Sequence, residues 1–138
     1  MKLTLLEKSI YFKGLLLLLR KDNRIADEER DMMMSVCDTM GFDKTFCKQA
    51  IDTLLENEYI LDEEPLFSSP DIAKYFISDG FRLACSDRDL AEQEVEFLRN
   101  TSVKNGIEDE WFDEMLESYS VCDSAKNSIN ELKVAVLL

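Results

Sequence analysis

The sequence contains no histidine. Histidine is the commonest general base, the commonest zinc ligand and the side chain that titrates nearest neutral pH. Its absence also excludes the Glu-x-x-His pairs of a ferritin-like di-iron site. We find no nucleophile motif and no glycine-rich phosphate loop in the sequence. The residues therefore give no support to an enzyme, and we expect a protein without catalytic activity.

Glycine and proline are also scarce, with four and two residues among 138. An all-β fold needs more turn signals than this, so helix is the default expectation. A chain of this length can bury a core without metal or disulfide crosslinks. Hydrophobic residues make up 46% of it, which is ordinary for a globular protein. We therefore predict a single all-α domain over residues 1–138.

Long apolar runs are missing as well. No stretch approaches the ~18 apolar residues of a membrane span, and Glu7, Lys8 and Lys13 interrupt the first apolar run, which is unlike a signal peptide. We therefore expect no direct membrane insertion and a cytoplasmic location.

The four cysteines show no C-x-x-C spacing, so they indicate neither a zinc knuckle nor a thioredoxin-type motif. They are Cys37, Cys47, Cys85 and Cys122. Cys37 and Cys47 fall on the apolar faces of expected helices. We predict that they are buried, reduced and packed as small hydrophobic residues, as in a cytosolic protein.

Positive charge is in short supply, and the formal net charge is −13. Such a surface repels phosphate backbones and anionic lipid headgroups, so we expect no nucleic-acid partner. The same charge suits a basic protein surface or a cation, and it also keeps a small helical protein in solution. The sequence leaves the oligomeric state open.

An internal repeat organises the chain. Residues 22–29, DNRIADEE, recur 65 positions later as residues 87–94, DRDLAEQE. Each copy is an acidic turn that leads into an amphipathic helix. The copies match at Asp22/Asp87, Ile25/Leu90, Ala26/Ala91 and Glu29/Glu94. Two units are too few for a solenoid, so we expect two halves that share one core about a pseudo-two-fold axis.

Hydrophobic periodicity predicts a compact bundle of about seven helices. The two halves cover about 3–57 and 70–120, with a connector over 58–69 and a C-terminal helix over about 124–137. The helices of the halves are expected over 3–20, 26–40 and 44–57, then from Pro70, over 91–104 and over 108–119. Gly41 and Gly106 are expected to end the middle helix of each half.

Three further expectations concern individual side chains. Phe46 belongs to the apolar stripe of its helix and should point inward. Trp111 holds the same place in the second half and should also be a core residue. Gly80, inside the helix that begins at Pro70, should mark a close contact between helices.

The repeated pattern resembles the TerB-like tellurite-resistance family. Its signature is an apolar helix, a turn of the type Asp-Gly-x-Ile-x-x-x-Glu and a second amphipathic helix, given twice in an acidic helical chain. Residues 22–29 fit with Asn23 at the usual glycine, and residues 87–94 fit with Arg88 there. The resemblance spans about residues 3–120. It implies a bundle of about seven helices without enzymatic activity, and roles in bacterial stress responses, beside membrane proteins or in metal binding by acidic clusters.

The acidic turns have two interpretations. In one, Asp22, Glu29, Asp87 and Glu94 supply oxygen ligands to Ca²⁺ or Mg²⁺. An EF-hand is excluded because the first half of each loop lacks oxygen donors. In the other, the two glutamates lie at the third helical position and bond back to the N-cap N–H group. The sequence favours capping. For the function, we expect a non-enzymatic module that acts through protein contacts, with a basic protein or a membrane protein as its partner. Metal binding or sensing is the alternative.

Overall fold

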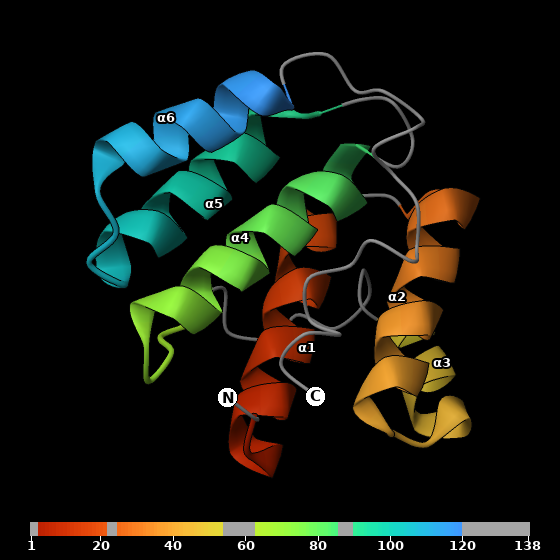
Figure 1. Ribbon diagram of the computed structural model, residues 1–138. Coiled ribbons are helices and arrows are strands. Elements are labelled where there is room, and N and C mark those ends of the chain that lie inside the picture. Colours follow the sequence, from red (N-terminus) through yellow and green to blue (C-terminus); the bar gives the residue numbers. More distant parts are fainter. Residues whose placement is uncertain (1–2, 22–24, 54–62, 86–89, 120–138) are drawn as a thin grey trace.

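A computed structural model describes residues 3–21, 25–53, 63–85 and 90–119. Over these ranges the chain is helical without strands, so the predicted all-α bundle is confirmed (Figure 1). The helices are α1 (Leu5–Arg20), α2 (Asp27–Met40), α3 (Lys44–Thr53), α4 (Pro70–Ala84), α5 (Glu92–Lys104) and α6 (Asp109–Ser118). The seventh predicted helix, over 124–137, lies outside the described residues. Among the described helices, none combines the length and hydrophobicity that a membrane span requires.

Local signals set the helix ends. Ser69 caps α4 by accepting a hydrogen bond from the Asp71 N–H at 3.1 Å, and Pro70 fits the first helical position because its missing N–H is not needed there. Gly41 ends α2 in a left-handed conformation with a φ of 78°, and Gly106 follows α5 with a φ of 71°. Both predicted glycine stops are confirmed.

The three helices of each half repeat with the spacing of the sequence. α3 covers residues 44–53 and α6 covers 109–118, which is the same interval 65 positions later. The main helix contacts repeat too. α1 and α4 pack on each other at the centre, α1 also contacts α2 and α5, and α4 contacts α5 and α2, while α3 rests on α2 and α6 rests on α5. Exchanging the two halves leaves this set of contacts unchanged.

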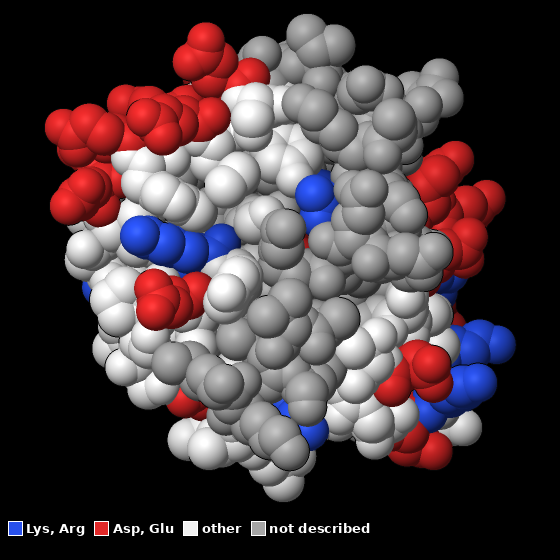
Figure 2. Space-filling view, in the orientation of Figure 1, with Lys and Arg blue, Asp and Glu red and all other residues white. Residues whose placement is uncertain are grey.

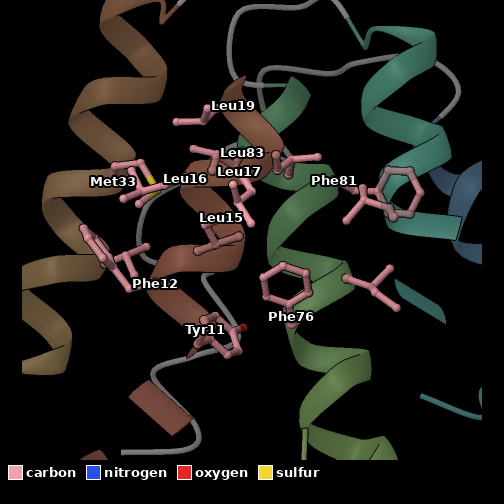
Figure 3. Packing of buried hydrophobic residues seen from close by; sticks show 14 of the residues in the cluster. Tyr11, Phe12, Leu15, Leu16, Leu17, Leu19, Met33, Phe76, Phe81 and Leu83 are labelled. Carbon is pink, nitrogen blue, oxygen red and sulfur yellow. The ribbon is translucent and has the colours of Figure 1, made fainter. Parts of the chain in front are cut away.

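The core lies around α1 and α4 (Figure 3). Leu15 to Leu19 are all buried, which confirms α1 as a central helix. Gly80 permits the close packing of α4, because a Cβ at this position would lie 2.7 Å from a methyl carbon of Leu98 on α5. The predicted close contact at Gly80 is therefore confirmed.

A buried polar pair joins α1 to α4. The Tyr11 hydroxyl donates a 2.6 Å hydrogen bond to the Asp79 carboxylate, and both residues are fully buried. By the 65-residue repeat, Phe76 on α4 is the equivalent of Tyr11, and Gly14 on α1 is the equivalent of Asp79. A Cβ on Gly14 would lie 2.8 Å from the Phe76 ring. The two equivalent contacts between α1 and α4 therefore differ. One is the hydrogen bond from Tyr11 to Asp79, and the other is the packing of the Phe76 ring against Gly14.

The cysteines correct one prediction. Cys37 on α2 and Cys47 on α3 are buried as expected, but they form a disulfide with their Cα atoms 6.4 Å apart. The prediction that they are reduced was wrong. α2 and α3 form a hairpin around Gly41, which brings two apolar-face residues ten positions apart into disulfide range. Cys85 is also disulfide-bonded, and Cys122 lies outside the described residues.

In the second half, α6 is attached to its neighbours without an equivalent disulfide. Ser102 and Phe112 stand at the positions of Cys37 and Cys47. Phe112 is buried against Phe81, with ring centroids 5.5 Å apart, and the Arg99 guanidinium lies 4.6 Å from its centroid. A disulfide therefore attaches the outer helix of the first half, and aromatic packing attaches that of the second.

The inward orientation predicted for Phe46 was wrong, since 57% of this residue is exposed. α3 packs mainly on α2 and buries only Cys47 and Ile51. Only a narrow strip of the surface of α3 is therefore buried, and Phe46 lies beside that strip. The apolar pattern gave the correct helix but too wide a buried face.

Candidate functional site

The first candidate site is the pair of acidic turns at residues 22–29 and 87–94, here called the acidic corners. The Ala26 N–H donates a 3.0 Å hydrogen bond to Glu29 Oε1, and the Ala91 N–H donates a 3.0 Å bond to Glu94 Oε1. Both glutamates are fully buried. Alanine has no side chain with which to cap a helix, so the glutamate at the third position bonds back to the N-cap backbone instead. The capping interpretation is confirmed for Glu29 and Glu94.

The metal interpretation keeps only part of its support. Asp22 and Asp87 lie outside the described residues, so the structure positions Glu29 and Glu94 alone, at the starts of α2 and α5. Each uses one carboxylate oxygen for capping. Across the described ranges, no group of three or more cysteine, aspartate and glutamate side chains is arranged to hold a metal ion. The four-carboxylate site remains a prediction.

The Tyr11–Asp79 pair does not form a reactive site. Burial, together with the adjacent Asp79 carboxylate, raises the pKa of Tyr11 well above its ordinary value of 10.0. A phenol of that kind exchanges no proton near neutral pH. Both side chains are also closed off from solvent, so the pair has a structural role in holding α1 against α4.

The outer helices, α3 and α6, differ in charge. The exposed face of α6, with the residue before it, is strongly acidic, and Figure 2 shows these carboxylates gathered at upper left. They are Glu108, Asp109, Glu110, Asp113, Glu114 and Glu117. On α3, Lys44 and Lys48 stand at the positions of Asp109 and Asp113. The net charge of −13 does not indicate this difference, whereas the residues at equivalent positions of the two halves do.

A hollow of about 250 Å³ lies between α4 and α6. Its lining combines aromatic, thioether and charged side chains: Asp71, Lys74, Tyr75, Ser78, Trp111 and Met115. The Lys74 ammonium lies 5.5 Å from the centroid of the Trp111 ring, within the range of a cation–π interaction. Trp111 packs against the core but is only partly buried, so the prediction of a core residue was right in part.

A second hollow, of about 310 Å³, lies between α1 and residues 63–66. The Lys104 ammonium stands on its rim and donates to Glu63 Oε1 at 3.2 Å and to the Glu64 carbonyl at 2.7 Å. These contacts tie the connector to α5. Lys104, Glu63 and Glu64 in the lining of this hollow are thus engaged by contacts within the chain itself.

The fold and these surfaces define an acidic, all-α protein made of two like halves whose outer helices differ in charge. Comparisons with known protein families, with curated proteins and with solved structures find no match to the chain. The resemblance to the TerB-like family therefore stays a prediction from the repeated turn.

Proposed function

We propose that the chain is a non-enzymatic acidic helical module that acts through contacts with another protein. The observation that carries this proposal is the pair of aromatic residues on the outer helices. Phe46 on α3 and Trp111 on α6 occupy equivalent positions, and both reach the surface. Exposed aromatic side chains are enriched at protein interfaces. By contrast, the buried Glu29, Glu94 and Tyr11 already serve helix starts and helix packing.

The biological setting belongs to the same proposal. From the family resemblance we infer a role in a bacterial stress response or as an accessory to a membrane protein, in the cytoplasm. The Cys37–Cys47 disulfide is the feature that opposes a cytoplasmic location, because such bonds persist mainly in oxidising compartments. Alkylation of free thiols in intact cells before lysis decides this point. Blocked Cys37 and Cys47 support the cytoplasm, and thiols protected as a disulfide contradict it.

Site-specific photocrosslinking in the producing cells tests the contact role. A photoreactive phenylalanine analogue replaces Phe46 in one variant and Trp111 in another. A third variant carries it at Asp38, an exposed residue of α2. We expect one defined protein to be crosslinked from position 46 or 111 and not from position 38. Equal crosslinking from all three positions, or none from any, would contradict the proposal.

The alternative is divalent metal-ion binding or sensing through Asp22, Glu29, Asp87 and Glu94, with Ca²⁺ or Mg²⁺ as the ion. Its support is that two equivalent carboxylates are fully buried at the acidic corners. Titration calorimetry with Ca²⁺, Mg²⁺ and Mn²⁺ separates it from the first proposal. Heat that disappears in the Asp22→Asn/Asp87→Asn variant supports metal binding, and no heat with any ion removes it.

A further inference from the structure

We propose that the hollow between α4 and α6 receives a basic amphipathic segment of a partner protein. The segment seats one apolar side chain against Trp111 and Met115 and turns its Lys or Arg residues toward the carboxylates of α6. This inference rests on the proposed role of the chain in protein contacts. It adds the surface that is used and the chemistry of the partner.

The size of the hollow selects the kind of occupant. This hollow is open to the surface and has a volume of about 250 Å³, a little below the 300–1,000 Å³ that is usual for small-molecule sites. A volume of this size accommodates one large side chain. Its apolar lining comes from Tyr75, Trp111 and Met115. Aromatic rings and adaptable methionine side chains are the groups that protein interfaces use around an anchoring residue.

The charges around the hollow select the sign of the partner. Glu110 and Glu114 lie four residues apart on α6, so they share one side of the helix, beside Trp111. Lys74 is the basic member of the lining, and its ammonium already lies over the Trp111 ring. The Trp111 ring thus already faces a cation of the chain itself. A Lys or Arg of a partner would meet the exposed carboxylates of Glu110 and Glu114.

A second copy of the chain is the main competing occupant, because α3 presents Phe46 beside Lys44 and Lys48. The formal net charge of −13 opposes the approach of two copies at low salt. A separate basic protein meets no such repulsion, so we assign the hollow to it.

Trp111 is the only tryptophan in the sequence, so its fluorescence reports on this hollow alone. The probe is a synthetic amphipathic helical peptide of leucine, lysine and alanine. Its controls are the same peptide with glutamate in place of lysine, and a scrambled peptide of the same composition. We expect the lysine peptide to change the Trp111 emission in a saturable, salt-sensitive way, and the two controls to leave it unchanged.

Matched charge variants localise the binding. Glu110→Gln/Glu114→Gln removes two charges beside the hollow, whereas Glu28→Gln/Asp31→Asn removes two exposed charges on α2. We expect the first variant to weaken peptide binding about 3- to 10-fold and the second to leave it unchanged, because close charge pairs contribute more than distant ones. Equal weakening in both variants, or equal binding of the scrambled peptide, would overturn the proposal in favour of diffuse electrostatic attraction.

Self-association is tested in the same experiment without peptide. If the Trp111 emission depends on protein concentration, and Lys44→Glu/Lys48→Glu abolishes that dependence, a second copy occupies the hollow and the proposal is overturned. A partner crosslinked from position 46, with no effect of the peptide on Trp111, would overturn this inference and leave the proposed contact function intact.

Discussion

Tyr11 and Phe76 stand at equivalent positions in the two halves, and their rings meet edge to face with centroids 5.3 Å apart. The contact therefore joins each half to its counterpart at the centre of the bundle. Beside it, Tyr11 bonds to Asp79 and Phe76 packs against Gly14. One polar and one apolar contact thus stand at equivalent positions of the interface between α1 and α4. The polar pair fixes how the two helices face each other, and the glycine lets them pack closely.

Removing the Tyr11 hydroxyl should destabilise the protein. Tyr11→Phe keeps the ring but leaves the buried Asp79 oxygen without this donor, and we expect a loss of about 1–3 kcal/mol in the free energy of unfolding. Urea denaturation measures this loss. Tyr75→Phe, on the partly exposed face of α4, is the control and should change stability by less than about 0.5 kcal/mol. Equal effects of the two variants would contradict a structural role for the Tyr11–Asp79 bond.

The same tyrosine predicts an alkaline dependence. The pKa of Tyr11 is raised in the folded state, so above about pH 10 the unfolded chain loses this proton while the folded chain keeps it. Stability from this group is complete below pH 10 and falls as the pH rises further. Tyr11→Phe should therefore flatten the decline in unfolding free energy between about pH 10 and 11.5, and an unchanged slope would contradict the assignment.

The disulfide should act on the first half alone. Cys37→Ser/Cys47→Ser removes a crosslink that closes a short loop, which typically contributes about 2–3 kcal/mol. Because α3 buries little besides Cys47 and Ile51, we expect its amide protons to lose protection from hydrogen exchange. α6, attached by Phe112, should keep its protection. Loss of protection in both helices to the same degree would mean that the disulfide stabilises the whole bundle rather than α3.

The sequence was informative where the signal is local. Gly41, Gly106 and the Ser69–Pro70 pair marked helix ends, since a left-handed glycine and a capped proline act within one turn of the chain. The glutamates at the third helical position predicted the caps for the same reason.

The features that the sequence did not predict depend on distance in the fold. Tyr11 and Asp79 are 68 positions apart, and neither residue alone indicates its partner. The Cys37–Cys47 bond depends on the angle at which α2 and α3 meet, and hydrophobic periodicity does not predict that angle. The hollow at Trp111 exists only because α6 lies beside α4, so an apolar stripe could not separate a core position from a surface one.

Paired alanine substitutions at Glu29 and Glu94 test the central claim that the chain is two like halves whose acidic corners start helices. We expect Glu29→Ala and Glu94→Ala each to lower the free energy of unfolding by about 1–2 kcal/mol, within about 0.5 kcal/mol of each other. The exposed Glu92→Ala is the control, with a loss of a few tenths. Urea denaturation, with and without Ca²⁺, should give the same values. A loss in only one half, or a loss that appears only with Ca²⁺, would contradict the account.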